Sequence, residues 1–324
     1  MQGTPLARHK ATAPRPAFTV RRITYTIGAE VQGLDLSQPL SVADADALYA
    51  ALAEHKVLFF RGQQMTPTQH LALARTFGTP TGKHPVYPCD PETPEVTVLV
   101  SNAANPPDTD SWHTDLTWSP EPIFASILYC RETPDVGGDT LWADMAAAYD
   151  ALPAGVKADI AELRCVHDMA DFRNNFTVGE PDGAARKLND AFGRFGSAIH
   201  PMVCVHPFTK RKYLNCNPGF VNQVVGMKVA DSRRLLTYLW DHLNSPEFHV
   251  RFAWTVDAVA MWDNLQTMHY GPCAFDLTQT RRMSRVTVAN DRRADELRAA
   301  EAEAPSGDGQ ANGVKKRKQD AVAP

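Results

Sequence analysis

Residues 258–271 read AVAMWDNLQTMHYG. The stretch opens with a compact apolar run, typical of a buried strand, and then supplies His269 beside a glycine. Shortly after it, residues 281–288 (RRMSRVTV) form a second β-branched run that carries Arg281 and Arg285. A chain that turns back after His269 into this second strand brings both guanidinium groups close to the imidazole. The two runs therefore predict β-structure with a polar site at one edge.

Similar runs recur along the chain. Further strands, bounded by Pro, Gly and Asp, are predicted at residues 17–25, 56–60, 95–100 and 202–206. Helical periodicity, often with a Ser or Thr cap near its start, predicts helices at residues 42–55, 66–77, 144–152 and 231–244. Strands are spread throughout without regular βαβ alternation and without an internal repeat. The pattern by itself indicates an α+β sandwich or barrel.

Composition places the chain among ordinary globular proteins. Of its 324 residues 44% are apolar and 22% charged, which favours one domain, predicted at residues 17–292. Residues 1–16 are basic and proline-bearing, so we expect a disordered N-terminal tail, and residues 293–324 form a low-complexity C-terminal tail. A net charge of −4 gives no overall field that would gather nucleic acid or an anionic membrane. We therefore expect neither as a partner.

Localisation and redox state follow from what the sequence lacks. No stretch approaches the roughly 18 apolar residues that span a bilayer, and no apolar signal core opens the chain, so a cytoplasmic protein is expected. The six cysteines are scattered without a C-x-x-C pair. This spacing indicates reduced thiols rather than a disulfide scaffold or a thiolate zinc site.

Residues 111–118 (SWHTDLTW) place His113 and Asp115 two positions apart. On an extended chain both side chains would lie on one face and could chelate one ion. An isolated H-x-D pair is a weak signal, since on the order of one such match arises by chance in a chain of this size. With His269 it makes two histidines and one carboxylate, a facial triad that leaves three cis positions open.

The downstream arginines strengthen this interpretation. A 2-oxo dicarboxylate that chelates iron through its 2-oxo acid end needs an anchor for its far carboxylate, and arginine supplies a bidentate donor fork. Thr140, in the segment GGDTLW, can add a hydroxyl donor. Strand arginines more often face solvent, but their coincidence with the triad favours a role in the site for Arg281 and, less directly, for Arg285.

The sequence resembles the taurine/2-oxoglutarate dioxygenase family over nearly all of residues 17–292. The resemblance is carried by linked motifs that occur in the family's order: IGAEVQGLDLSQPL, KVLFFRGQ, HPVYP, SWHTDLTW, GGDTLWADM, MWDNLQTMHYG and RRMSRVTV. It implies a double-stranded β-helix, a distorted jelly roll with flanking helices and a site in the mouth between two sheets. It also implies Fe(II) as metal, with 2-oxoglutarate and O₂ as co-substrates.

The resemblance assigns roles to individual positions. His113, Asp115 and His269 match the iron ligands, and Thr140 and Arg281 match the anchors of 2-oxoglutarate. The substrate-binding positions that it implies are His84, Tyr87, Thr109, Leu116 (through its main-chain amide), Asn175, Phe176, Phe220 and Arg285. A guanidinium, a protonatable imidazole and an amide N–H suit a tetrahedral anion such as a sulfonate or sulfate.

The implied substrate is a small organic anion. Taurine or a related alkyl sulfonate stands first, and its oxidation would give an aldehyde and sulfite with succinate and CO₂. The positions of Thr109 and Asn175 depart from the taurine enzyme's amine pocket, and extra residues surround LNCNPGF, so an alkyl sulfate, an aryloxy-carboxylate or a biosynthetic substrate stays open.

Two other classes of protein fit part of the sequence. A zinc-dependent hydrolase could use the same two histidines and aspartate, but it leaves the paired arginines without a role. A binding module that has lost its metal is disfavoured because all three ligands are present. The resemblance also allows a homo-oligomer, although no feature of this sequence indicates one.

Overall fold

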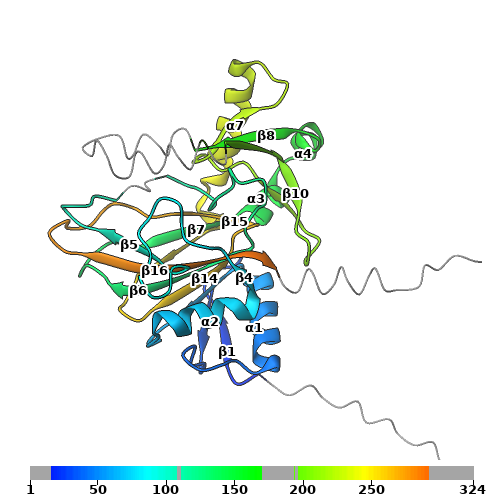
Figure 1. Ribbon diagram of the computed structural model, residues 1–324. Helices are drawn as coiled ribbons and strands as arrows, with labels where there is room; N and C mark the ends of the chain where they lie inside the picture. Colours follow the sequence, from blue (N-terminus) through cyan, green and yellow to red (C-terminus); the bar gives the residue numbers. More distant parts are fainter. Residues whose placement is uncertain (1–15, 108–110, 170–192, 194–195, 292–324) are drawn as a thin grey trace, which may run out of the picture.

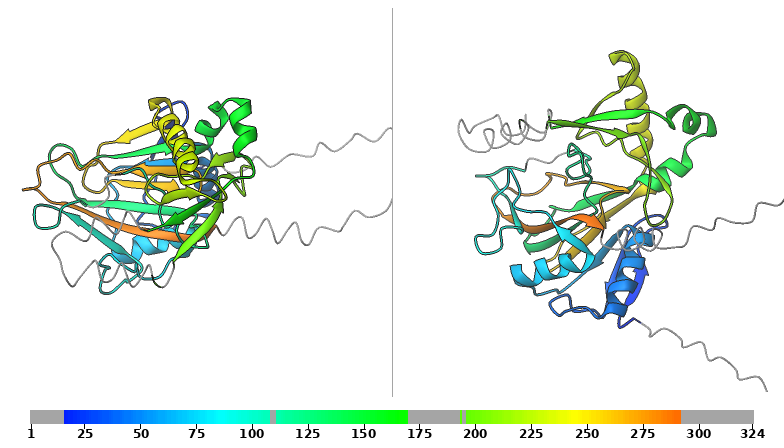
Figure 2. Two further views of the ribbon diagram at one scale, coloured as in Figure 1. Left: turned by 90° about the horizontal axis from the view of Figure 1, so that it is seen from above. Right: turned by 45° about the vertical axis from the view of Figure 1, so that its right-hand side comes forward.

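The chain folds into four layers in the computed structural model, which describes residues 16–107, 111–169, 193 and 196–291. Two helices cover one side of a large sheet, a smaller sheet lies on its other side, and a group of helices and short strands forms the outermost layer (Figure 1). The right-hand view of Figure 2 shows the same layering after a turn about the vertical axis, and the left-hand view looks down onto the outermost layer. Within the described residues, no helix is long and apolar enough to cross a membrane.

The large sheet is mainly antiparallel and has the order β1-β2-β3-β14-β6-β16-β4, with β5 also paired to β16. Its strands are β1 (Thr19–Arg22), β2 (Ala29–Gln32), β3 (Val57–Phe60), β4 (Gly78–Pro80), β5 (Thr97–Ser101), β6 (Ala125–Glu132), β14 (Val259–Asp263) and β16 (Arg281–Asp291). Strand β14 lies at its centre and is buried along its whole length. Strands distant in sequence thus meet beside β14.

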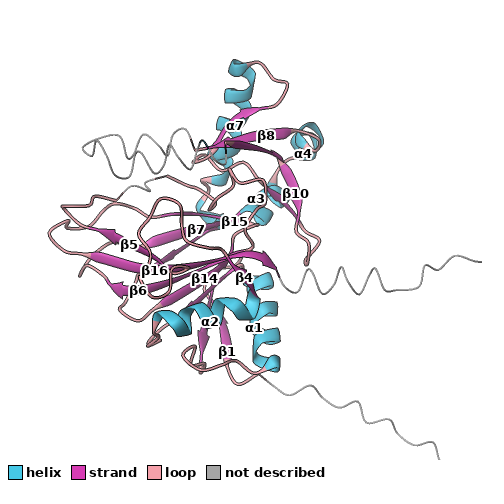
Figure 3. Ribbon diagram, viewed as in Figure 1, coloured by secondary structure: helices cyan, strands magenta, loops and turns pink. Residues whose placement is uncertain are grey.

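The smaller sheets complete the strand structure (Figure 3). One has the order β13-β7-β15, another β12-β8-β9, and β10 pairs with β11. Their strands are β7 (Thr140–Asp144), β8 (Arg164–Asp168), β9 (Ser197–Pro201), β10 (Val203–Val205), β11 (Lys212–Leu214), β12 (Val221–Val224), β13 (His249–Phe252) and β15 (Thr267–Tyr270). The sheet β13-β7-β15 faces the large sheet and forms the second wall of the jelly roll.

Local sequence explains where the main helices begin. The helices are α1 (Val42–His55), α2 (Pro67–Phe77), α3 (Met145–Ala151), α4 (Ala154–Ile160), α7 (Val229–Leu243) and the 3₁₀ turn η1 (Pro246–Phe248). The Ser41 hydroxyl accepts the Asp44 N–H at the start of α1, and Thr66 forms a capping box with Gln69 before α2. Asp144 caps α3 by accepting two main-chain N–H groups.

Aromatic residues fill the space between the two facing sheets. Phe59 stacks on Phe252 with ring centroids 4.3 Å apart, and Trp142 contacts Trp262 at 5.6 Å. Alternate side chains of the large sheet face the other way, where they pack against α1 and α2. The core between the sheets therefore fixes how β14 and β7, which lead to the site, lie relative to each other.

The strands and helices expected from the sequence are present, and the prediction of a jelly roll with flanking helices is confirmed by the fold and by the solved structures described below. One detail differs from expectation: His269 lies on the separate strand β15 rather than at the end of the apolar strand β14. All six cysteines are free thiols, as predicted. The predicted tails at residues 1–16 and 293–324 lie outside the described residues, apart from Pro16.

Candidate active site

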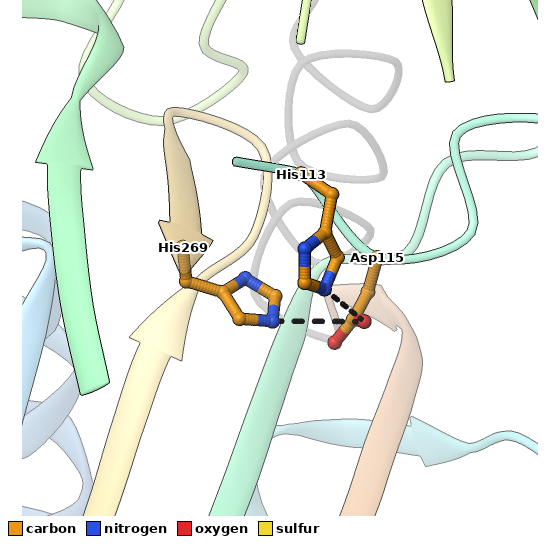
Figure 4. Close-up of side chains that lie close together, drawn as sticks. All are labelled: His113, Asp115 and His269. Atoms are coloured by element: carbon orange, nitrogen blue, oxygen red, sulfur yellow. Dashed lines mark ion pairs between the residues drawn. The ribbon is translucent and has the colours of Figure 1, made fainter. Parts of the chain in front are cut away.

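His113, Asp115 and His269 converge at the mouth between the two sheets (Figure 4). The Nε2 atoms of His113 and His269 lie 3.9 and 3.8 Å from Asp115 Oδ1, and all three side chains are buried. These separations are too long for hydrogen bonds. Ligands that lie about 2.1 Å from one metal ion are roughly 3 to 4 Å from each other, so the three atoms are spaced as ligands of one ion would be.

Two different chain segments bring the triad together. His269 lies on β15, and its main-chain N–H and C=O both pair with His113, at 2.7 and 2.9 Å. After this isolated bridge the chain enters a turn, so Asp115 does not continue an extended strand as the sequence pattern suggested. Leu116 has a left-handed φ of 56°. The turn, rather than strand alternation, directs the carboxylate toward the two imidazoles.

The donor set suits a divalent metal. His113 Nδ1 donates to the Ser111 carbonyl oxygen at 2.9 Å, which leaves Nε2 with its lone pair. Burial, followed by the nearby His113, lowers the pKa of His269 to about 3, so its imidazole is neutral. Neutral imidazoles and an ionised carboxylate are the forms that bind metal. The residues therefore fit Fe(II) in a site with two histidines and one carboxylate.

Asp115 is held in its ionised form by its neighbours. Arg285 Nη1 donates to Oδ1 at 2.9 Å, and the Ser126 hydroxyl donates to Oδ2 at 3.1 Å. Burial alone would raise the pKa of this carboxyl, but the Arg285 guanidinium, aided by the Ser126 hydrogen bond, outweighs burial and holds the pKa well below its usual range. Asp115 therefore stays charged and able to bind a cation.

A second cationic group, Arg281, lies at the start of β16. Arg281 Nε donates to the Gly138 carbonyl oxygen at 2.9 Å, and Nη2 donates to the Thr140 hydroxyl at 3.3 Å. Among the described residues it has no ion-pair partner, and burial lowers its pKa only to about 10, so it remains charged. The Trp254 indole N–H also donates to the Thr140 oxygen, at 3.0 Å. The Thr140 proton is thus free to be donated to a carboxylate that binds Arg281.

His84 differs from the protonated donor that the sequence suggested. Its Nδ1 accepts the main-chain N–H groups of Val86 and Tyr87, at 3.2 and 3.0 Å, and burial together with Arg285 lowers its pKa to about 3. The ring is therefore neutral, with its proton on Nε2. His84 can still donate one hydrogen bond, but it does not add a positive charge.

One cavity joins these groups. Its described lining comprises His84, Val86, Tyr87, Leu99, Ser101, His113, Asp115, Leu116, Trp118, Leu128, Thr140, Met169, Phe220, Trp262, His269, Gly271, Arg281 and Arg285. The Phe220 ring lies edge-on to the His113 ring, with centroids 6.1 Å apart. Three expected substrate-binding residues, Thr109, Asn175 and Phe176, lie outside the described residues.

Sequence reasoning missed several polar supports of the site. Ser126 and Asn264 hold Asp115, and Trp254 holds Thr140. Asn264 lies within the motif MWDNLQTMHYG, but a motif does not reveal which buried amide contacts which loop. Ser126 and Trp254 carry no local signal, because their roles depend on strands that become neighbours only in the folded chain.

Comparison with known proteins identifies the family. Residues 19–287 match the family described as taurine catabolism dioxygenase TauD, TfdA family. The chain belongs to this family. An alpha-ketoglutarate-dependent sulfate ester dioxygenase from Pseudomonas putida is 36% identical, over 87% of this chain and 93% of the relative. A 2,4-dichlorophenoxyacetate dioxygenase from Cupriavidus pinatubonensis is 29% identical, over 81% and 94%.

Solved structures agree with this assignment. A taurine dioxygenase from Burkholderia xenovorans superimposes with a TM-score of 0.72 at 36% identity, covering 85% of this chain and 90% of that one. The AAD-2 protein, solved with Mn(II) and N-oxalylglycine, gives a TM-score of 0.71 at 30% identity, with 85% and 98% covered.

As a TauD/TfdA family member, this enzyme is a 2-oxoglutarate-dependent dioxygenase that uses Fe(II), 2-oxoglutarate and O₂. The predicted enzyme class and cofactors are thereby confirmed. The relatives named above are dioxygenases. Membership of this family therefore favours a dioxygenase over the two alternative classes, a zinc-dependent hydrolase and a binding module that has lost its metal.

Proposed function

We propose that His113, Asp115 and His269 bind the iron and that Arg281 with Thr140 holds the distal carboxylate of 2-oxoglutarate. The triad is spaced for one ion, and Arg281 is a charged group without an ion-pair partner among the described residues. A carboxylate at Arg281 would accept from the guanidinium and from the Thr140 hydroxyl. When bound, Fe(II) and 2-oxoglutarate activate O₂ for oxidation of a substrate C–H bond, with release of succinate and CO₂.

We further propose that the organic substrate is the sulfate ester of an apolar alcohol. Its anion would bind Arg285, whose buried Nε has no hydrogen-bond partner among the described residues, together with the His84 Nε2–H and the Leu116 amide. Arg285 would then bridge the anion and Asp115, because its Nη1 already contacts that carboxylate. An anion held by Arg285 would in this way lie beside the metal ligand Asp115, with the adjacent substrate carbon directed toward the metal.

The apolar part of the cavity wall supports a sulfate ester of an apolar alcohol as the substrate. Besides the charged groups and histidines, the described lining includes the apolar residues Val86, Leu116, Trp118, Met169 and Phe220, and the centroid of the Tyr87 ring lies 4.9 Å from that of the His84 ring. Within the described lining, Asp115 is the only carboxylate, and it is engaged by Arg285. Among the described lining residues, an ammonium such as that of taurine would find no free carboxylate and would lie against apolar groups, at a cost of desolvation. An anion with an apolar tail fits this surface better.

An alkyl sulfonate carries a similar anion and is the second candidate. A relative that is 36% identical in sequence is a sulfate ester dioxygenase, whereas a solved structure of the same identity is a taurine dioxygenase. The products separate the two substrate classes. Oxidation at the carbon beside the ester oxygen gives an aldehyde and sulfate, whereas oxidation beside a sulfonate gives an aldehyde and sulfite.

A substrate panel tests the proposal. The enzyme is supplied with Fe(II), 2-oxoglutarate and O₂, together with an alkyl sulfate, an alkyl sulfonate of equal chain length, taurine or 2,4-dichlorophenoxyacetate. We expect kcat/KM for the alkyl sulfate to exceed that for taurine at least tenfold, with sulfate and succinate formed in equal amounts. A preference for taurine would overturn the sulfate ester assignment, and metal-independent succinate would overturn the proposed iron site.

Arg285 supplies the matched variant. Arg285→Gln should lower kcat/KM for the alkyl sulfate by about a hundredfold, because it removes a charged hydrogen bond worth roughly 2 to 3 kcal/mol. Arg282→Gln changes the neighbouring arginine, which is 52% exposed and pairs with Glu132, and should leave kcat/KM unchanged. Equal losses in both variants would contradict a role for Arg285 in anion binding.

A further inference from the structure

Asn264 is a buried amide directly after β14, and it contacts the main chain of Asp115 in both directions. Its Nδ2 donates to the Asp115 carbonyl oxygen and its Oδ1 accepts the Asp115 N–H, each at 3.1 Å. The residue is 1% exposed, and it is not among the described residues that line the cavity. Any effect on the site must therefore pass through Asp115 and Leu116.

The segment that Asn264 contacts needs such support. Asp115 lies in a turn rather than in a sheet, and Leu116 adopts a left-handed conformation with φ 56°. A residue with a Cβ adopts this conformation at a cost of about 1 to 2 kcal/mol, so the surrounding structure must hold it in place. Two amide hydrogen bonds to Asp115 replace the pairing that a neighbouring strand would otherwise give.

The three metal-ligand candidates are fixed in different ways. His113 and His269 are joined by main-chain hydrogen bonds that no side-chain substitution removes. Asp115 is joined to the β14–β15 turn through the side chain of Asn264. That turn is itself braced by Asp263, whose Oδ1 accepts the Leu265 N–H at 3.0 Å. Asn264 thus connects the carboxylate to the same turn that leads to His269.

We propose that Asn264 is a positioning residue that sets the Asp115 carboxylate at its distance from the two imidazoles and aims the Leu116 amide into the cavity. The inference rests on the proposed metal site, but it concerns a residue that contacts neither metal nor substrate. Loss of the amide leaves the Asp115 N–H and C=O buried without partners, and the turn relaxes away from the His113–His269 bridge. Outer contacts of this kind alter metal affinity by about 10- to 100-fold.

The test compares two buried amides. Asn264→Leu keeps the side-chain volume but removes both hydrogen bonds. The control is Gln63→Met, because Gln63 also holds main chain in both directions: it accepts from the Leu36 N–H at 2.7 Å and donates to the Leu34 carbonyl oxygen at 3.1 Å, away from the cavity. Mn²⁺ affinity is measured by calorimetry without O₂, and thermal unfolding is measured on the metal-free proteins.

We expect both variants to lose thermal stability but only Asn264→Leu to bind Mn²⁺ at least tenfold more weakly. Unchanged Mn²⁺ affinity in Asn264→Leu, or an equal loss in Gln63→Met, would overturn the positioning role. If Asn264→Leu does not fold, Asn264→Ala is measured instead, against the same tenfold threshold. The smaller side chain leaves room for water to bind the Asp115 N–H and C=O, so this variant should lose less stability.

The same experiment separates this inference from the proposed function. Wild-type enzyme that binds no Mn²⁺, or His113→Ala with undiminished affinity, would remove the metal site itself and the inference with it. Wild-type binding that depends on His113 but not on Asn264 would leave the metal site intact and overturn the inference alone.

Discussion

At the scale of single residues, the site is governed by the ionised Asp115 and the groups around it. Arg285, Ser126 and Asn264 each contact this residue, and the imidazoles of His113 and His269 point at the same carboxylate oxygen. Such packing leaves little tolerance for displacement, because a shift of about 1 Å can cost on the order of a hundredfold in rate. Close packing around the two histidines should therefore affect metal affinity as much as the hydrogen bonds to Asp115 do.

Gly219 provides a test of that tolerance. A Cβ at this position would lie 2.7 Å from His113 Cβ, so Gly219→Ala must displace the histidine or its loop. We expect Mn²⁺ affinity to fall about tenfold, as for loss of a contact that orients a ligand. Gly155→Ala, where nothing lies within 4 Å, serves as the control and should bind Mn²⁺ normally. Normal affinity in Gly219→Ala would show that the His113 loop is not closely confined.

At the scale of elements, a buried ion pair connects the large, helix-covered sheet to the sheet β13-β7-β15, which carries Thr140 and His269. Lys56, which follows α1 in a left-handed conformation, pairs with Asp144 at 2.9 Å, and both side chains are almost fully buried. Asp144 also caps α3 at the end of β7. One carboxylate thus joins β3, β7 and α3 behind the site.

Removing one partner of this pair should be costly. Lys56→Met leaves the Asp144 carboxylate buried without its cation, so we expect the free energy of unfolding to fall by about 3 to 5 kcal/mol. The exposed pair of Arg234 and Asp231 is the control, and Arg234→Met should cost less than about 1 kcal/mol. Urea denaturation of both variants measures the difference. Losses of similar size would mean that the buried pair does not connect the layers.

At the scale of the whole molecule, the layered core also buries histidines that do not belong to the candidate metal triad. Burial lowers the pKa of His70 and of His167 to about 3, from an ordinary value of 6.5. Both are therefore neutral in the folded chain at pH 5, whereas in the unfolded chain they are mostly protonated. Because the unfolded state binds more protons between pH 6.5 and pH 3, stability is complete above pH 6.5 and is lost as pH falls toward 3.

This pH dependence predicts acid-sensitive folding. Each such histidine contributes a slope of up to about 1.4 kcal/mol per pH unit within that window. His70→Gln removes one titrating group, so the free energy of unfolding should fall less steeply between pH 6.5 and pH 4 than in the wild type. Denaturant unfolding at a series of pH values provides the measurement. An unchanged slope would show that His70 is protonated in the folded protein.

The sequence by itself determined the type of fold and the chemistry. Apolar runs and capped helices predicted the helices α1, α2, α3 and α7 and several strands, including β14 and β16, because strand and helix periodicity are local properties of a chain. Strands such as β6 and β7 were not predicted from their local pattern. The order of the motifs indicated the dioxygenase family, which the comparisons confirm. The residues proposed for the metal and for 2-oxoglutarate, including His113, His269 and Arg281, can all be identified from the sequence, and the structure brings them to one cavity.

Tertiary structure alone decided how those residues are held and charged. The turn at Asp115, the neutral state of His84 and the bond from Arg285 to Asp115 depend on strands that are distant in sequence. The amide contacts of Asn264 join residues 149 positions apart. Local periodicity cannot report such pairs, because burial and hydrogen-bond partners arise only when β14, β15 and β16 pack around the loop that carries the carboxylate.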